Sequence, residues 1–182
     1  MEEPLSNETT LNQPTAEGTR LDELWSILPE ESSRVAGESG GELAIGGVSV
    51  TERAERYGTP LHIVDEVGLR RQIRRFIDGL RERWPNSEVL YASKSFPVVG
   101  MYRLAQEEGL SVDVAGGGEI KLALAAGVDP ERLHFHGNAK TDAELSIALE
   151  AGIGTIIVDN FDEIERLERL LTKPQNVLLR VI

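Results

Sequence analysis

The sequence predicts an α/β fold, an incomplete (β/α)8 barrel with about five barrel strands and a short β segment at its N-terminal side. Short apolar strands alternate with amphipathic helices, and the strand–helix unit recurs about every 22 residues. The strands centre on Tyr91, Val112, His134, Ile156 and Leu178. This even rhythm favours a barrel over a doubly wound sheet, in which one connection reverses the winding. The 182 residues are fewer than the roughly 250 of a complete barrel.

The first part of the chain has a different composition from the rest. Residues 1–20 are rich in Glu, Thr, Asn and Pro, which predicts a disordered acidic tail. Residues 21–60 predict a short capping helix, which could instead dock on a partner surface, and a small hairpin over Leu43–Val50 that turns at Gly46-Gly47. Residues 61–182 are then the truncated N-terminal part of the barrel.

The spacing of apolar residues predicts the remaining elements in order. Leu61–Val64 is predicted to be a strand, and a long amphipathic helix runs from about Glu66 to Trp84. Four further helices are expected at Val98–Glu108, Gly118–Ala126, Asp142–Ala151 and Phe161–Leu171.

The ends of these elements carry two further signals. Gly109, Gly127 and Gly152 stand just past helix ends, where a left-handed glycine closes many helices. The last strand, 176–182, reaches the final residue, so we expect either a fragment or a sheet that is completed by association.

Composition excludes several classes of function. The chain has 31 Asp+Glu against 19 Lys+Arg, a net charge of −12, so it offers no basic face to a nucleic acid. Without cysteine there is no disulfide, thiolate metal site or cysteine nucleophile. No run approaches the roughly 18 apolar residues of a membrane span, and the N-terminus lacks the pattern of a signal peptide. We therefore expect a cytoplasmic protein without nucleic-acid or membrane partners.

Ionisable residues follow the predicted strands where an active site of a parallel barrel would lie. They are Lys94, Asp113, His136 with Asn138, Asp159, and Arg180. Because the carboxyl ends of parallel strands share one mouth, these side chains are expected to converge there. Such a cluster indicates chemistry on a charged small molecule or a phosphate-bearing cofactor.

Two of these segments allow a functional and a structural interpretation. Lys94 follows an apolar strand, and a partly dehydrated lysine there can offer a free amine that forms a Schiff base. Alternatively, it simply points to solvent. The glycines Gly116–Gly118 could bring backbone N–H groups to an anion, or only permit a tight turn before Glu119 enters the first turn of a helix.

The remaining candidates are two histidines, an arginine and an aspartate. His134 and His136 lie two apart on a strand and so share a face, but zinc needs at least a third ligand, and we predict no metal site. Arg180 lies within an apolar strand and needs either a partner charge or a functional role. Asp159 is expected to cap the helix that follows it.

Four phrases in this order resemble the pyridoxal-phosphate-dependent decarboxylases that act on ornithine, arginine or diaminopimelate, most closely the diaminopimelate branch. The resemblance covers roughly residues 42–182. The phrases are Gly58-Thr59-Pro60-Leu61-His62-Ile63-Val64-Asp65, Tyr91-Ala92-Ser93-Lys94-Ser95-Phe96, Val112-Asp113-Val114-Ala115-Gly116-Gly117-Gly118-Glu119 and His136-Gly137-Asn138-Ala139-Lys140.

The resemblance implies an alanine-racemase-like barrel, a second β domain and pyridoxal 5'-phosphate as cofactor. It implies that Lys94 holds the cofactor covalently and serves in catalysis, and that further residues bind the cofactor. These are Asp113, Glu119, His136, Asn138 and Arg180. The implied reaction converts meso-diaminopimelate, a small-molecule amino-acid substrate, to L-lysine and carbon dioxide, and the implied assembly is a homodimer.

The family's later glycine-rich phosphate loop and its second domain have no counterpart in these residues, which implies that the chain is inactive alone. Three alternatives remain open. The first is another decarboxylase of the family, acting on ornithine, arginine or carboxynorspermidine. The second is an amino-acid racemase or a pyridoxal-phosphate carrier. The third is a non-catalytic relative that regulates or scaffolds a complete enzyme.

Overall fold

The computed structural model describes residues 32–35 and 42–181. The predicted acidic tail and capping helix lie outside these residues. The chain divides between Leu69 and Arg70 into two compact units, which are described separately below.

The first unit contains a three-stranded antiparallel sheet in the order β1-β2-β3. Its strands are β1 (Ser32–Val35), β2 (Glu42–Ile45) and β3 (Val48–Ser49). Gly46 and Gly47 join β2 to β3 with φ angles of 58° and 77°, which glycine adopts without the strain that a side chain brings. The predicted hairpin is therefore confirmed, whereas β1 was not predicted.

The helix α2 (Val50–Tyr57) was also not predicted. Ser49 caps it, because its side chain accepts a hydrogen bond from the Glu52 backbone N–H at 3.2 Å. Ser49 and Glu52 stand three residues apart, which is the sequence signature of a helix start, so the signal was present in the chain.

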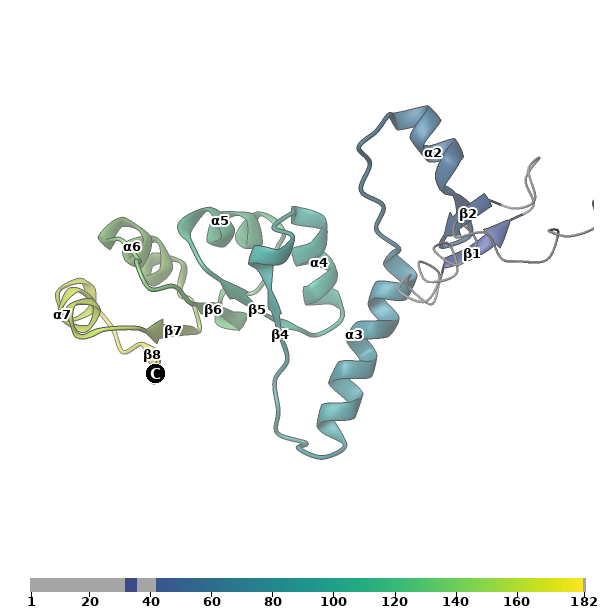
Figure 1. The fold of residues 1–182 in the computed structure, drawn as a ribbon. Coiled ribbons are helices and arrows are strands. Elements are labelled where there is room, and N and C mark those ends of the chain that lie inside the picture. The colour runs from purple at the N-terminus through teal and green to yellow at the C-terminus, as the bar shows by residue number, and fades with distance from the viewer. Residues whose placement is uncertain (1–31, 36–41, 182) are drawn as a thin grey trace, which may run out of the picture. The chain divides into compact units, whose positions relative to one another are not determined.

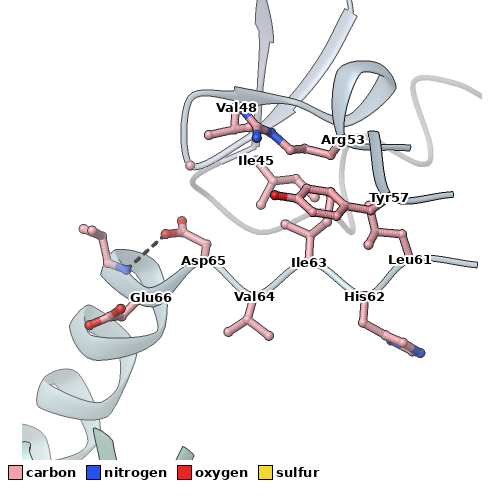
Figure 2. A pocket seen from close by; sticks show the side chains of 12 residues that line it. Ile45, Val48, Arg53, Tyr57, Leu61, His62, Ile63, Val64, Asp65 and Glu66 are labelled. Atoms are coloured by element: carbon pink, nitrogen blue, oxygen red, sulfur yellow. Dashed lines mark hydrogen bonds between the residues drawn. The ribbon is translucent and has the colours of Figure 1, made fainter. Parts of the chain in front are cut away.

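The prediction of a strand at Leu61–Val64 is wrong. The segment is extended, but no ladder pairs it with another strand among the described residues. Leu61 and Ile63 are half-buried while His62 and Val64 are exposed, so the period of two is real. The segment instead lines an open hollow of about 540 Å³, shown in Figure 2.

The second unit holds a five-stranded, wholly parallel sheet in the order β4-β5-β6-β7-β8 (Figure 1). Consecutive strands are always neighbours, which is the order of a barrel wall, and the described strands do not close into a ring. The strands are β4 (Leu90–Ala92), β5 (Ser111–Val114), β6 (Leu133–Phe135), β7 (Thr155–Val158) and β8 (Asn176–Leu179). All five predicted strand centres are confirmed.

Helices alternate with these strands as the period predicts. They are α3 (Glu66–Arg81), α4 (Val99–Glu107), α5 (Gly117–Ala125), α6 (Asp142–Ala151) and α7 (Phe161–Leu170), with short 3-10 turns η1 (Ser93–Ser95) and η2 (Pro130–Arg132). Gly109, Gly127 and Gly152 follow α4, α5 and α6 with positive φ, which confirms their role as helix ends.

The hydrophobic core lies where these helices pack on the sheet. Val112, Phe135 and Ile156 of the strands are fully buried, as are Ile120 and Leu145 of the helices. The strand β8 differs, because its Val177 and Leu179 are 46% and 67% exposed.

No helix among residues 32–35 and 42–181 has the length and apolar character to cross a bilayer.

Candidate active site

Three predicted site residues follow adjacent strands of the parallel sheet. Lys94 lies in η1 directly after β4 and is exposed. Asp113 lies near the end of β5, opposite Ala92 of β4 and His134 of β6, and His136 follows β6. Parallel register therefore brings an amine, a carboxylate and an imidazole to one end of the sheet, as predicted.

Asp113 is the centre of this group. Its Oδ2 lies 3.8 Å from His136 Nδ1, and its buried Oδ1 has no hydrogen-bond partner among the described residues. Burial raises the pKa of the Asp113 carboxyl, the nearby charges of His136 and Lys94 lower it in part, and Glu119 raises it further. A buried carboxylate oxygen without a hydrogen-bond partner, in the same site as an exposed amine, is typical of a ligand-binding site.

Glu119 connects the turn that carries Lys94 to the turn after β5. Its Oε2 lies 2.6 Å from the hydroxyl of Ser93, which is fully buried, and accepts the Ala115 backbone N–H at 2.8 Å. The Ser93 hydroxyl also lies 2.8 Å from the Asp113 carbonyl oxygen. Sequence analysis did not single out Ser93, although a small polar residue directly before Lys94 was the available signal.

The glycine-rich turn after β5 serves close packing. The Gly117 backbone N–H donates to Glu144 Oε1 at 3.0 Å, and a Cβ on Gly117 would stand 3.1 Å from Glu144 Cγ. Hydrogen bonds from the backbone N–H groups of Gly117 and Thr141 lower the pKa of Glu144. Because a carboxylate already occupies this helix start, the structure favours a tight turn over an open anion site.

The two histidines of the β6 phrase have different partners. His134 Nε2 lies 3.3 Å from Glu88 Oε2, whereas His136 faces Asp113. Within the described part of the chain, His, Asp and Glu form no group of three that could hold a metal ion.

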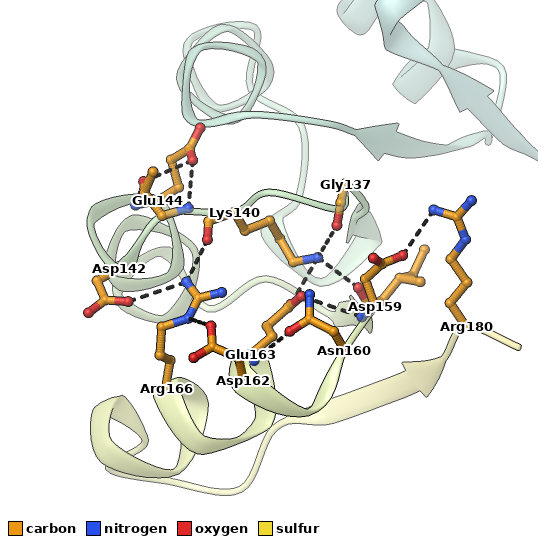
Figure 3. A network of polar contacts seen from close by, with 12 residues as sticks. Gly137, Lys140, Asp142, Glu144, Asp159, Asn160, Asp162, Glu163, Arg166 and Arg180 are labelled. Atoms are coloured by element: carbon orange, nitrogen blue, oxygen red, sulfur yellow. Dashed lines mark hydrogen bonds and ion pairs between the residues drawn. The ribbon is translucent and has the colours of Figure 1, made fainter.

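The expectation that Asp159 caps α7 is wrong. Asn160 is the cap, because its Oδ1 accepts the Glu163 backbone N–H at 2.8 Å, and Asp159 stands one residue too early to do so. Asp159 instead pairs with Arg180, whose Nη1 lies 3.0 Å from Asp159 Oδ1 (Figure 3). The partner charge that Arg180 requires is thus present.

Two residues of the His-Gly-Asn-Ala-Lys phrase behave in opposite ways. Asn138 is exposed, and no hydrogen bond links it to the other candidate residues in the described ranges. Lys140, which the sequence analysis names only as part of this motif, is 3% exposed and pairs with Glu163, which was not singled out.

Comparison with known proteins adds a family to this geometry. The model of the pyridoxal-dependent decarboxylase family, pyridoxal binding domain, matches residues 70–182. Diaminopimelate decarboxylase from Bacillus methanolicus is 46% identical over 144 residues, which cover 78% of this chain and 33% of that protein. The Bacillus subtilis enzyme is 48% identical with the same coverage. The chain thus spans about a third of the length of these relatives.

Solved structures agree with the sequence relatives. Diaminopimelate decarboxylase from M. jannaschii in complex with L-lysine is similar with a TM-score of 0.73 and 27% identity, over 83% of this chain and 36% of that one. Its matching part therefore shares the arrangement of strands and helices described above.

Proposed function

Because the chain belongs to the pyridoxal-dependent decarboxylase family, we propose that it supplies the lysine-bearing part of a diaminopimelate decarboxylase. The reaction is the conversion of meso-diaminopimelate to L-lysine and carbon dioxide. The observation that carries this proposal is the convergence of Lys94, Asp113 and His136 at one end of the parallel sheet.

The residues at this end suit pyridoxal phosphate. Lys94 would hold the cofactor through Nζ, while Asp113, Glu119, His136, Asn138 and Arg180 would surround it. Asp113 Oδ1, which has no hydrogen-bond partner within the described ranges, offers a buried acceptor, and Lys94 offers an exposed amine. When bound, the cofactor supplies the electron sink that accepts the electron pair left by the departing carboxylate.

The chain's own residues would orient the reacting groups and move protons. To hold the cofactor, Lys94 Nζ would have to lose a proton, and it would take one up again when it is released. Glu119, through its contact with Ser93, keeps the Lys94 turn in a constant position relative to Asp113. The Asp159 carboxylate keeps the Arg180 guanidinium at the end of β8.

The amino-acid substrate is the finer part of the proposal. The relatives reported above are diaminopimelate decarboxylases, and the His136–Lys140 phrase favours the same branch. Ornithine, arginine and carboxynorspermidine are the alternative substrates, and racemisation is the alternative reaction. We also propose a homodimer as the assembly of the intact enzyme, by resemblance to the family, and analytical ultracentrifugation of the protein would measure it.

Release of labelled carbon dioxide tests the proposed reaction. The protein that carries this chain is loaded with pyridoxal phosphate and given meso-diaminopimelate, ornithine or arginine. We expect release from meso-diaminopimelate, and a loss on the order of a thousandfold or more in Lys94→Ala. Release only from ornithine or arginine would contradict the substrate. Inversion at the α-carbon without release would identify a racemase.

A further inference from the structure

A fully buried ion pair lies next to the loops that follow β6 and β7. Lys140 Nζ stands 2.8 Å from Glu163 Oε1, and the two side chains are 1% and 0% exposed. Lys140 Nζ also donates to the carbonyl oxygens of Gly137 at 2.5 Å and Ile157 at 2.8 Å. The ammonium thus donates hydrogen bonds to two carbonyl oxygens and faces Glu163 as an ion pair, while Glu163 Oε1 makes no hydrogen bond among the described residues.

The groups that Lys140 contacts lie in or next to the two loops that carry site residues (Figure 3). Gly137 directly follows His136 in the loop after β6. Ile157 lies near the end of β7, and Glu163 Oε2 accepts the Asp159 backbone N–H at 3.4 Å in the loop after β7. One buried ammonium therefore connects the loop after β6 to β7 and α7, the two elements that flank the loop after β7.

The first loop is held tightly against the loop after β5. Gly137 has φ of +125°, and a Cβ there would stand 3.2 Å from the Ala115 carbonyl oxygen. The His136 backbone N–H donates to the Val114 carbonyl oxygen at 2.8 Å. A displacement of Gly137 would therefore move His136 relative to Asp113.

The second loop sets the place of Arg180. Asp159 pairs with Arg180 at 3.0 Å, and the Arg180 backbone N–H donates to the Val158 carbonyl oxygen at 2.9 Å. A displacement of Asp159 would therefore move the guanidinium at the end of β8.

We infer that the Lys140–Glu163 pair is a positioning device, which fixes His136 and Arg180 relative to Lys94 by holding the loops after β6 and β7 together. A buried ion pair is costly to desolvate, and apolar residues of similar volume often replace one without loss of stability. Because such a pair adds little to stability, we assign it the role of holding the two loops in place. The inference rests on the proposed function, because it assigns the two loops to the cofactor site.

Replacement of the whole pair separates geometry from stability. Lys140→Met alone would leave a buried carboxylate without a counter-charge, so the test variant combines Lys140→Met with Glu163→Leu. The control combines Arg74→Met with Glu108→Met, which removes the ion pairs that Glu108, at the end of α4, forms with Arg74 and Arg70 of α3. Each protein is followed by thermal unfolding, hydrogen–deuterium exchange, and reductive trapping of pyridoxal phosphate on Lys94.

The double variant is expected to unfold at a temperature close to that of the wild type. Its amides at 136–140 and 159–161 should exchange about tenfold faster, with the core strands unchanged. Trapping on Lys94 at a subsaturating cofactor concentration should fall about tenfold, because misplacement of about 1 Å can cost even more. The control should match the wild type in exchange at 136–140 and 159–161 and in trapping on Lys94, although its melting temperature falls because the ion pairs of Glu108 with Arg70 and Arg74 are lost.

Gly137→Ala keeps the inference testable if the double variant does not fold. It leaves both charges in place, and should speed exchange only at 136–140 and weaken trapping on Lys94. Wild-type exchange and wild-type trapping in either folded variant would overturn the inference. If the wild type itself fails to trap the cofactor, the proposed function fails, while the exchange comparison still decides whether the pair holds the two loops.

Discussion

At the scale of single residues, the site combines groups that are unfavourable for stability alone. Only 22% of the Asp113 side chain is exposed, and one of its carboxylate oxygens lacks a hydrogen-bond partner among the described residues. Unsatisfied buried polar atoms are rare in folded proteins and tend to occur where a ligand completes them. We therefore expect the Asp113 carboxylate to lower the stability of the fold and to contribute to ligand binding.

Asp113→Asn should raise the melting temperature at pH 7 by about 1–3 °C. Burial raises the pKa of Asp113 above its ordinary 3.8. The stability from a raised pKa is present below the unfolded value and is lost as pH rises through the folded value, so the ionised form is the costly one. The gain should therefore vanish below pH 3.8 in a series of thermal melts. If Asp113→Asn melts at the same temperature as the wild type at pH 7, or at a lower one, the claim that the ionised Asp113 destabilises the fold is contradicted.

Ser93→Ala should destabilise the protein by about 1–2 kcal/mol, because it leaves the Glu119 carboxylate without the buried hydroxyl at 2.6 Å. It should also weaken cofactor trapping on Lys94. Ser95→Ala is the matched control, since the Ser95 hydroxyl is exposed and donates to the Ala92 carbonyl oxygen at 2.8 Å. Urea unfolding of both variants measures the difference, and equal effects would show that Ser93 has no special role.

At the scale of elements, Glu108 joins α3 to the end of α4. Its carboxylate lies 2.8 Å from Arg70 Nη1 and 2.6 Å from Arg74 Nε, and only 5% of the side chain is exposed. Hydrogen bonds from Arg74 and Arg70 lower the pKa of Glu108 to about 2. The long helix is thereby attached to the end of α4 by charge, and its Ile77 is buried in the hydrophobic core.

Glu108→Gln should lower the melting temperature at neutral pH. Because the folded pKa is depressed, the stability from this group is present above the unfolded value of 4.5 and is lost as pH falls toward 2. Melting curves of the wild type and Glu108→Gln should therefore converge near pH 2. Glu107→Gln, whose side chain is 49% exposed, should show a smaller difference at every pH. A constant gap between wild type and Glu108→Gln down to pH 2 would contradict the pairing.

Two glycines should respond oppositely to alanine. A Cβ on Gly154, before β7, would stand 1.9 Å from the Glu131 carbonyl oxygen, so Gly154→Ala should cost about 3 kcal/mol. Gly79 lies inside α3, and no atom of the described residues lies within 4 Å of the added Cβ, so Gly79→Ala should gain about 0.5–1 kcal/mol. Chemical denaturation measures both, and a tolerated Gly154→Ala would refute the close approach of η2 to this segment.

At the scale of the whole molecule, the repeat was readable from the sequence because each strand–helix unit is local. The period located every strand of the parallel sheet, and Asp142–Ala151 was predicted with the bounds that α6 has. Leu61–Val64 shows the limit of such patterns, since alternation indicates an extended segment but not a pairing partner. The strand β1 has the converse problem, because Ser32-Ser33-Arg34-Val35 contains one apolar residue and shows no alternation, although it pairs with β2.

The site was predictable to the same degree. Parallel strands end at one edge, so Lys94, Asp113 and His136 could be grouped from their order alone. The buried partner of Lys140 could not be found in this way, because Glu163 lies on the next helix and its burial follows from packing between α6 and α7. The same holds for Asp159. Its position before α7 suggested a helix cap, whereas its actual partner, Arg180, lies on the next strand–helix unit.

The central claim is that Lys94 is the residue that holds the cofactor, and the chain provides its own comparison. Its lysines are Lys94, Lys121, Lys140 and Lys173. Lys121 and Lys173 are exposed on other parts of the fold, while the Lys140 side chain is 1% exposed. Incubation with pyridoxal phosphate, reduction with borohydride and peptide mass mapping measure how the label distributes among them. We expect the label to concentrate on Lys94 at low cofactor concentration, and to disappear from that peptide in Lys94→Ala. An even distribution over Lys94, Lys121 and Lys173 would contradict the assignment.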